Sequence, residues 1–254
     1  MIARAVLLML ALTLAACGNT DNGRLQGWVE ADFVFVGPDE TGRVETLEVR
    51  EGDTVETGAP LFAVDADLQR SDLQMQEAAV TNAQQAYDRA AALLKTSAGT
   101  QKALEDAEAA LRTAKARLNS SQTRLARRKL SSPVTGAVQQ IYYRPGEMVP
   151  AGRPVLSILP PGNIKVRFFV GEAMLPKLAL GDTVDVTCDG CAPVLAKVSF
   201  IARAAEYTPP VIYSLEERNK LVFMVEARTE APGGLRVGQP VSVALKERSA
   251  EARK

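Results

Sequence analysis

One short stretch of this 254-residue chain is written twice, and the two copies are far apart. Residues 41–65 read TGRVETLEVREGDTVETGAPLFAVD, and residues 135–159 read TGAVQQIYYRPGEMVPAGRPVLSIL. The copies align without a gap, and identical positions include Thr41/Thr135, Gly42/Gly136, Val44/Val138, Gly52/Gly146, Val55/Val149, Gly58/Gly152 and Pro60/Pro154. Short apolar runs broken by glycine and proline are typical of β-strands joined by turns. One copy is too small to bury a core, so we expect two copies to close a small β-sandwich about a pseudo-twofold axis.

The residues between the copies are predicted to form two α-helices. Residues 67–95 contain no Gly or Pro and are rich in Ala, Gln and Leu, which favour helix. The sequence TSAG at residues 96–99 interrupts the pattern, and residues 100–129 resume it. The second helix carries a seam at steps of three and four, made of Leu104, Ala107, Leu111, Ala114, Leu118, Ser121 and Leu125. The first helix offers Ala79, Ala83, Ala86, Ala90 and Leu93 at the same spacing. The short break predicts an antiparallel hairpin, and its two neighbouring ends allow it to be inserted into a loop of the sandwich.

The rest of the chain is predicted to be β-structure. Residues 161–245 contain about four to six short strands and one short helix near residues 173–180, which together favour a small β-barrel. A charged tail follows at residues 246–254. The predicted fold class is therefore α+β. Residues 25–66 and 132–160 form the split sandwich, residues 67–130 form the inserted coiled-coil hairpin, and residues 161–245 form the barrel.

The N-terminus has the features of a targeting segment. Arg4 precedes an apolar stretch at residues 5–14, which is shorter than the roughly 20 residues needed to cross a bilayer. The stretch ends in LAAC at residues 14–17, which resembles the lipobox of bacterial lipoproteins. That resemblance implies cleavage of residues 1–16, acylation of Cys17 and a lipid anchor outside the cytoplasm. The alternative is an ordinary signal peptide cleaved near Ala16.

Composition argues against several classes of function. Thirty Lys and Arg balance thirty Asp and Glu, so the net charge gives no indication of nucleic-acid binding. The chain has no histidine, which removes Ser-His-Asp and Cys-His catalysis and the commonest metal ligand. We therefore expect a protein that is not an enzyme and that holds no metal or other cofactor.

Two half-motifs that resemble a split lipoyl domain, divided by a helical hairpin, are similar to the HlyD-type membrane fusion proteins. These proteins are the periplasmic adaptors of tripartite efflux pumps and secretion systems. The resemblance covers about residues 25–245. It implies a lipid-anchored periplasmic protein that bridges an inner-membrane ABC transporter to a TolC-type outer-membrane channel and assembles as a hexamer or trimer. The residue after Cys17 is Gly18 and not the Asp associated with inner-membrane retention in enteric bacteria, so it does not decide the membrane. The resemblance favours the inner membrane for the anchor, and the outer membrane stays open.

The resemblance extends to the hairpin tip, which in this family docks onto the outer-membrane channel. The family pattern matches Arg89, Leu93, Leu94, Thr100, Leu104, Glu105 and Ala107. Gly99 departs from it, because a bulkier apolar residue is common there. Thr100 is also well placed to cap the second helix, and Arg89 is a permanently charged, bidentate hydrogen-bond donor. The structural alternative is that Arg89 is merely solvated and that Leu93 and Leu94 close the hairpin core.

Two further motifs lie in the predicted barrel. Residues 205–227, AEYTPPVIYSLEERNKLVFMVEA, resemble a signature of the adaptors that are paired with ABC-type exporters. Cys188 and Cys191 enclose Asp-Gly, which favours a two-residue hairpin turn with the cysteines facing each other at a Cα separation of roughly 5.5 Å. In an oxidising periplasm this spacing predicts a structural disulfide. A thioredoxin-like redox site would require a helix N-terminus beside a βαβ pattern, and zinc would require further ligands.

The sequence leaves three other functions open. The chain could be an adaptor-like envelope lipoprotein in lipid transport that has no channel partner, or a thiol-disulfide oxidoreductase using Cys188 and Cys191. It could also be a lipoyl or biotinyl carrier, but such a domain presents its lysine on a tight turn between the halves. Here the insert replaces that turn and holds the lysines Lys95, Lys102, Lys115 and Lys129.

The second predicted helix ends in four cations, Arg124, Arg127, Arg128 and Lys129. Positive charge is favourable at a helix C-terminus in itself, and contact with a partner subunit is the alternative.

Overall fold

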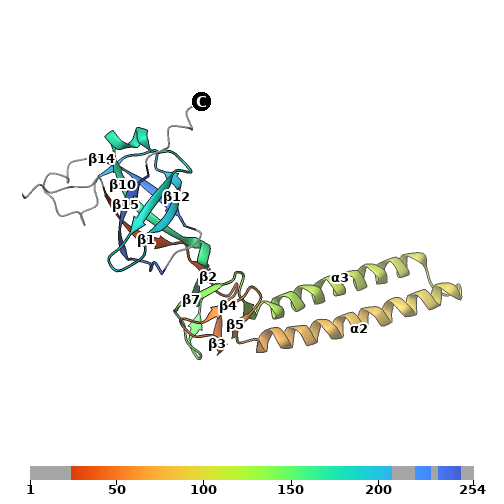
Figure 1. The fold of residues 1–254 in the computed structure, drawn as a ribbon. Helices are drawn as coiled ribbons and strands as arrows, with labels where there is room; N and C mark the ends of the chain where they lie inside the picture. Colours follow the sequence, from red (N-terminus) through yellow and green to blue (C-terminus); the bar gives the residue numbers. More distant parts are fainter. Residues whose placement is uncertain (1–23, 208–220, 230–233, 247–254) are drawn as a thin grey trace, which may run out of the picture. The chain divides into compact units, whose positions relative to one another are not determined.

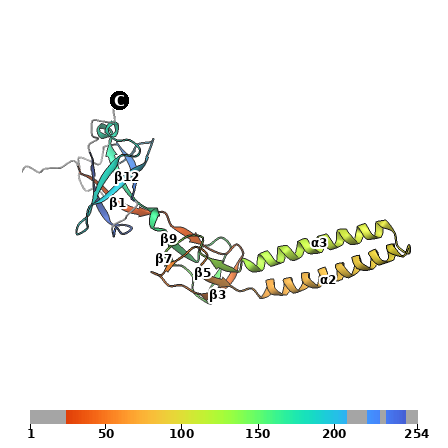
Figure 2. The same cartoon turned by 45° about the vertical axis from the view of Figure 1, so that its right-hand side comes forward.

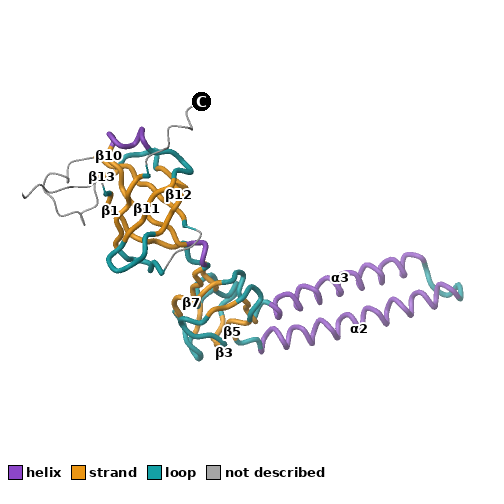
Figure 3. The backbone as a smooth tube through the Cα atoms, viewed as in Figure 1, coloured by secondary structure: helices purple, strands orange, loops and turns teal. Residues whose placement is uncertain are grey.

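The computed structural model describes residues 24–207, 221–229 and 234–246, and the chain divides into two units. One unit spans residues 32–161 and contains the sandwich with its hairpin; the other contains residues up to 31 and from 162 onward. Figure 1 shows the helical hairpin rising from the sandwich, and Figure 3 shows the strands of each unit in orange. The α+β class predicted from the sequence is confirmed.

The sandwich consists of two four-stranded antiparallel sheets among the described residues. One sheet has the order β2-β9-β7-β4 and the other β6-β5-β3-β8. The strands are β2 (Val34–Val36), β3 (Gly42–Leu47), β4 (Thr54–Val55), β5 (Pro60–Val64), β6 (Lys129–Ser131), β7 (Gly136–Ile141), β8 (Met148–Val149) and β9 (Leu156–Leu159). Both copies of the repeat fill the core between the sheets, which is made of Val36, Val44, Val49, Val55, Leu61, Phe62, Val64, Val138, Val149, Val155, Leu156 and Ile158.

Backbone hydrogen bonds confirm the predicted twofold relation of the two copies. Gly52 N–H donates to the carbonyl of Val138 at 2.8 Å, and Gly146 N–H donates to the carbonyl of Val44, also at 2.8 Å. The strand pairings are reciprocal in the same way, because β3 pairs with β8 and β4 pairs with β7. Gly52 and Gly146 have φ of 93° and 94°, a region that favours glycine, so the glycines shared by the two copies impose the same turn twice.

The insert forms an antiparallel helical hairpin, as predicted, with α2 (Asp67–Lys95) packed against α3 (Gln101–Ala126). At about 1.5 Å per residue the 29 residues of α2 extend about 43 Å. The two helices remain side by side when the view is turned (Figure 2). Every member of the predicted α3 seam is buried or half-buried. On α2 the half-buried seam runs through Ala79, Ala83, Ala86 and Ala90 as predicted, but it ends on Leu94 and not on Leu93.

The end of α3 differs from the predicted residue 129. The helix ends at Ala126, and Lys129–Ser131 forms β6, which pairs with β5. The carbonyl of Arg128 accepts a hydrogen bond of 2.9 Å from Val64 N–H. The chain therefore leaves the helix early because residues 128–131 are needed to extend the sheet.

The barrel contains seven strands among the described residues: β1 (Leu25–Ala31), β10 (Ile164–Gly171), β11 (Thr183–Thr187), β12 (Val194–Ile201), β13 (Glu206–Tyr207), β14 (Leu221–Arg228) and β15 (Pro240–Leu245). The order is β10-β1-β15-β11-β12-β14-β13, and a further pairing of β10 with β14 closes six of them into a ring. Short 3₁₀ turns occur at η1 (Pro161–Asn163) and η2 (Glu172–Lys177), the second near the predicted short helix. Val29, Val166, Phe168 and Val225 are fully buried in the interior.

The first strand lies in a different unit from the one expected. Residues from 25 onward were expected in the sandwich, but β1 pairs with β10 on one side and β15 on the other. The barrel can close only with a strand in that position, and Val29 is fully buried there. The sandwich unit therefore begins at Asp32.

Candidate functional site

The tip of the hairpin is a short, closely hydrogen-bonded turn. Ser97 N–H donates to the carbonyl of Leu94 at 3.0 Å, and Ala98 N–H donates to the carbonyl of Leu93 at 3.0 Å. Ser97 has φ of 59°, so these two bonds and this left-handed residue form a Schellman motif at the end of α2. The sequence did not indicate this motif, because the residue in the left-handed position is usually Gly. The motif satisfies the last carbonyls of α2 and fixes the direction in which the chain leaves it.

Thr100 caps the second helix, as predicted. Its backbone is extended, with φ of −113° and ψ of 150°, and its Oγ1 accepts a hydrogen bond of 3.2 Å from Ala103 N–H. With the Schellman motif on one side and this cap on the other, both ends of the connection at residues 96–100 are held by specific hydrogen bonds. The backbone of the tip is therefore fixed, and so are the positions from which its side chains project.

The remaining sequence-predicted tip residues divide between the surface and the seam. Arg89 is exposed and, within the part of the chain that the structure describes, makes no ion pair or hydrogen bond. Leu93 is 50% exposed, whereas Leu94 is half-buried on the seam toward α3. Arg89 and Leu93 are four residues apart on α2 and therefore share one face. The expectation that Leu93 closes the hairpin core is wrong, because Leu94 occupies that position.

Gly99 packs closely against the end of α2. A Cβ built on Gly99 would lie 3.0 Å from the backbone N of Leu94 and 3.1 Å from the Cβ of Leu93. The backbone N of Leu94 and the backbone C of Leu93, which is also 3.1 Å away, are fixed by the helix, so a larger side chain would displace the turn. The departure from the family pattern at this position is thus explained by the tight connection of this hairpin.

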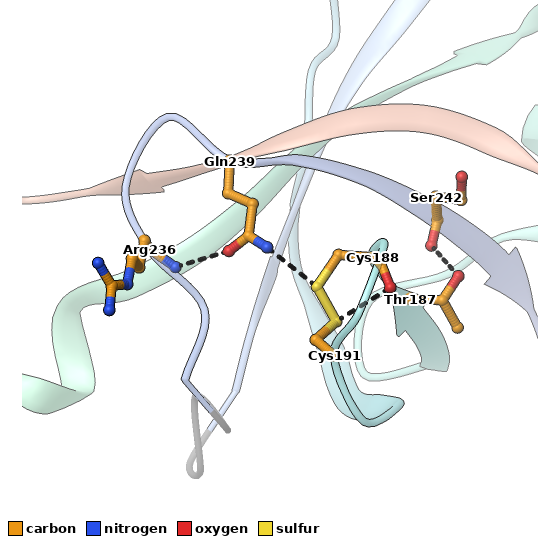
Figure 4. Close-up of a disulfide and its surroundings, with 6 residues drawn as sticks. All are labelled: Thr187, Cys188, Cys191, Arg236, Gln239 and Ser242. Atoms are coloured by element: carbon orange, nitrogen blue, oxygen red, sulfur yellow. Dashed lines mark hydrogen bonds between the residues drawn. A yellow bond between two sulfur atoms is a disulfide. The ribbon is translucent and has the colours of Figure 1, made fainter.

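The second predicted site is the Cys188–Cys191 pair, which the structure joins in a disulfide with a Cα separation of 5.4 Å. Figure 4 shows the bridge in the connection between β11 and β12. The last paired positions of these strands are Val186 and Val194, so the cysteines lie in a loop and not across the ladder as expected. A two-residue hairpin of the expected type needs φ > 0 at both central residues, and only Gly190, at 78°, has it.

The disulfide loop is tied to a second connection of the barrel. Cys191 N–H donates to the carbonyl of Cys188 at 3.3 Å, and Gln239 Nε2 lies 3.1 Å from Cys188 Sγ (Figure 4). Gln239 Oε1 in turn accepts a hydrogen bond of 3.0 Å from Arg236 N–H. The bridge lies between two strands, β11 and β12, and not at the start of a helix. It therefore lacks the helix N-terminus that activates the thiol of thioredoxin-like sites.

The other residues singled out from the sequence do not come together in a site within the described part of the chain. Within residues 24–207, 221–229 and 234–246, no group of three or more Cys, Asp or Glu side chains could hold a metal ion. The lysines considered for a carrier domain lie on helix or strand: Lys95 ends α2, Lys102 pairs with Asp106 on α3, and Lys129 begins β6. Cys17 lies outside the described residues, as do residues 208–220 of the exporter-type motif, although Glu206–Tyr207 pairs with β14. Neither α2 nor α3, nor any other described helix, is long and apolar enough to cross a bilayer.

Comparison with known proteins agrees with this arrangement. The family model "RND MFP, barrel-sandwich hybrid domain" matches residues 32–159, half of the chain. A UPF0194 membrane protein encoded in the asrC 5′ region of Acidithiobacillus ferridurans is 32% identical over 127 residues, which are 47% of this chain and 38% of that protein. The chain thus matches about two fifths of the length of such curated relatives.

Solved structures share the fold. A membrane fusion protein from Streptococcus pneumoniae R6 superimposes with a TM-score of 0.70 at 19% identity, covering 89% of this chain and 99% of that one. A MacA-MexA chimera that carries the Pseudomonas aeruginosa MexA α-hairpin domain gives a TM-score of 0.72 at 20% identity, covering 88% and 80%. With the family match over the sandwich and hairpin, the chain belongs to the RND/HlyD-type family of membrane fusion proteins, the periplasmic adaptors.

Proposed function

We propose that this protein is the adaptor subunit of a tripartite efflux or secretion system, in which the hairpin tip docks onto a TolC-type outer-membrane channel. The observation that carries the proposal is the pair of outward-facing residues at the tip. Arg89 has no partner among the described residues, and Leu93 is half exposed although Leu94 already completes the seam. A guanidinium that can bind carboxylate or carbonyl groups beside an apolar side chain is a suitable contact for another protein.

The mechanism is geometric, and no chemical step is required of the chain. The tip stands about 43 Å from the sandwich along α2, and both helices are continuous over their lengths. At the root of the hairpin, Arg128 Nη1 donates to the carbonyl of Thr41 at 3.2 Å, and Arg127 forms an ion pair of 3.0 Å with Asp39. These contacts join the hairpin to the sandwich, so displacement of the sandwich by a transporter would move the tip.

The transporter partner in this proposal is an inner-membrane ABC exporter. The support is the likeness of residues 205–227 to the exporter-type motif, of which Glu206–Tyr207 and Leu221–Arg228 form paired strands. The proposed location is the periplasm, with a lipid on Cys17 as the anchor and the inner membrane as the favoured side. Replacement of Cys17 by Ser should abolish incorporation of labelled fatty acid and release the protein from the membrane fraction.

The proposed assembly is a ring of six or three copies. Its support is the resemblance to the adaptor family, together with the charge on the shaft of the hairpin. Residues 67–88 of α2 carry Asp67, Asp72, Glu77 and Asp88 but only Arg70 as a cation, whereas residues 112–126 of α3 carry Arg112, Lys115, Arg117 and Arg124 and no carboxylate. An acidic α2 beside the basic α3 of the next copy gives electrostatic complementarity around a closed ring.

Site-specific crosslinking tests the docking step. A photoreactive residue at Ala98, on the exposed tip, should crosslink to the outer-membrane channel in intact cells. Arg89→Glu should reduce that crosslink and export by about tenfold or more, because the guanidinium hydrogen bonds are replaced by repulsion. Arg144→Glu, an equal charge change at an exposed position of the sandwich, away from the tip and from the charged shaft, should leave the crosslink intact. Unchanged crosslinking and export in Arg89→Glu would favour the other candidate, an envelope lipoprotein in lipid transport without a channel partner.

A further inference from the structure

A pocket lies where the hairpin joins the sandwich. Its volume is about 390 Å³, and it is lined by Pro38, Asp39, Glu40, Ser120, Thr123, Arg124, Arg127 and Arg128. The first three residues belong to the connection between β2 and β3, and the others come from the last turns of α3 and the two residues that follow. The channel-docking tip lies at the opposite end of the helices, so this pocket takes no part in docking; Asp39, Arg127 and Arg128 in its lining also join the hairpin to the sandwich.

The three arginines of the pocket are held to different degrees. Arg128 is only 7% exposed; its Nη1 donates to the carbonyls of Thr41 at 3.2 Å and Glu40 at 3.4 Å, and its Nη2 lies 3.7 Å from Glu40 Oε2. Its Nε is buried and has no hydrogen-bond partner. Arg127 is 65% exposed and bonds Asp39 at 3.0 Å. One guanidinium is thus fixed by the backbone, and a second is held only by an exposed ion pair.

The remaining lining residues supply further donors. Arg124 is exposed. The pKa of Asp72 on α2 is lowered by the nearby polar side chain of Ser121, by the hydrogen bond of 3.1 Å that Gln76 Nε2 donates to it, and by the charge of Arg124. Ser120 is exposed, and its hydroxyl makes no bond to the described residues, so it is free to donate into the pocket. Thr123 Oγ1 already donates to the carbonyl of Asn119 at 2.9 Å. The free donors are therefore the Ser120 hydroxyl and the outer edges of Arg124 and Arg127.

We propose that this pocket binds a phosphate ester, with its phosphate between Arg124, Arg127 and Ser120 and its organic part in the remaining volume. Planar guanidinium groups bind phosphate oxygens in pairs, which makes arginine clusters typical of phosphate sites. The volume is at the lower end of the range for small-molecule pockets, roughly 300–1,000 Å³, and is larger than bare phosphate requires. Capping of the α3 C-terminus accounts for positive charge there, but it does not require a pocket or a donor hydroxyl.

The carboxylates in the lining determine how the ligand enters. Exposed ion pairs contribute little, about 0–1 kcal/mol, so a dianionic phosphate can replace Asp39 as the partner of Arg127. Removing the Asp39 charge should therefore strengthen binding. A gain larger than the one from removing a carboxylate outside the pocket distinguishes a site in which Asp39 competes with the ligand from a basic surface that attracts any anion.

Calorimetric titration of the full chain at pH 7 and low salt tests the proposal, with glycerol 3-phosphate as the free ester and inorganic phosphate as the bare ion. We expect saturable binding, tighter for glycerol 3-phosphate. Arg124→Gln and Arg127→Gln should each weaken it by about tenfold, and Asp39→Asn should strengthen it severalfold. Matched controls are Arg117→Gln and Asp88→Asn, which carry the same charge changes at exposed positions outside the pocket. The five substituted positions are all exposed. Arg128 is left unchanged because it fastens the hairpin to the sandwich.

A second arm identifies the source of the phosphate. Vesicles of phosphatidylglycerol in phosphatidylcholine are added, with phosphatidylcholine alone as the reference. Vesicle binding that is lost in Arg127→Gln and displaced by glycerol 3-phosphate assigns the site to a lipid headgroup; binding of glycerol 3-phosphate alone assigns it to a soluble ester. No binding of either compound up to about 10 mM overturns the proposal. An equal loss in Arg117→Gln and Arg127→Gln, or no gain in Asp39→Asn, overturns it as well.

Discussion

The backbone N–H of Thr57 donates a hydrogen bond of 3.2 Å to the hydroxyl of Thr135, 78 residues further along the chain. The mirror of this contact occurs in the other half, where Ala151 N–H donates to the hydroxyl of Thr41 at 3.3 Å. Thr41 and Thr135 open the two copies of the repeat, and residues 57 and 151 occupy matching positions within them. Each threonine therefore holds a loop of the opposite copy, and the hairpin insertion leaves both contacts intact.

This reciprocity predicts losses of similar size from equal substitutions, somewhat larger for Thr135, whose hydroxyl also lies 3.3 Å from that of Thr57. Thr41→Val and Thr135→Val each remove the acceptor and leave a backbone N–H unpaired at the surface, which should lower the free energy of unfolding of the sandwich by about 0.5–1.5 kcal/mol. Urea denaturation of the two variants measures this. Thr46→Val, at an exposed strand position without a side-chain hydrogen bond among the described residues, is the control and should change little. A loss in only one of the two variants would contradict the symmetric role.

The twofold sandwich could be predicted from the sequence because it depends on local features. Glycines at matching positions impose matching turns, and the apolar positions of both copies repeat in step. The unit to which β1 belongs could not be predicted in this way. Its alternating pattern suits any half-buried strand, and its partners β10 and β15 lie more than a hundred residues away. Pairing over such distances is decided by closure of the barrel and leaves no local signature.

The tip shows a similar division. Thr100 could be identified as a cap because the preference of threonine for that position is a property of a few adjacent residues. The choice between Leu93 and Leu94 could not be made, because apolar steps of three and four allow the seam to end on either. The Schellman motif decides it, and Ser97 takes the left-handed position although Gly99 is close by. Gly99 is needed for its close approach to Leu93 and Leu94.

Thr100→Ala should loosen the start of α3. Loss of the bond from Ala103 N–H should cost about 1 kcal/mol, which corresponds to roughly fivefold faster amide hydrogen exchange in the first turn. Thr100→Ser keeps an accepting oxygen and should preserve the protection. Thr113→Ala, on the exposed face of the same helix, should not reduce it, because alanine favours helix. If Thr100→Ser loses channel crosslinking while it keeps amide protection, Thr100 contacts the channel directly and is not only a cap.

Glu226 should make the stability of the barrel sensitive to acid. It accepts from Lys165 at 3.1 Å and Arg167 at 2.8 Å, and its side chain is 13% exposed. Burial opposes its ionisation, but the hydrogen bonds and charges of Arg167 and Lys165 outweigh burial and lower the pKa of Glu226 below its ordinary 4.5. Because the pKa is lower in the folded chain, the ionised carboxylate stabilises the barrel above this ordinary pKa, and the contribution is lost as the pH falls through the folded pKa.

Glu226→Gln tests this assignment. At pH 7 the variant should lose about 2 kcal/mol of barrel stability, since two charged hydrogen bonds are weakened and Arg167 keeps only its ion pair with Glu30. The difference from the parent protein should shrink as the pH falls through the folded pKa. Glu206→Gln, at an exposed position of β13, should have an effect within about 0.5 kcal/mol at every pH. A difference between Glu226→Gln and the parent that does not change with pH would show that Glu226 acts through packing alone.

Removal of the disulfide should affect the barrel and leave the hairpin tip unchanged. The bridge closes a loop of four residues, for which chain entropy gives a stabilisation of about 2 kcal/mol. Replacement of both Cys188 and Cys191 by Ser should therefore lower the free energy of unfolding by up to that amount, and reductant should destabilise the parent protein but not the variant. Because the bridge lies between β11 and β12, far along the chain from the tip at residues 96–100, crosslinking from Ala98 to the channel should persist in the variant. If the double variant instead abolishes an insulin-reducing activity of the parent protein, the pair is a redox centre and the structural role assigned to it is wrong.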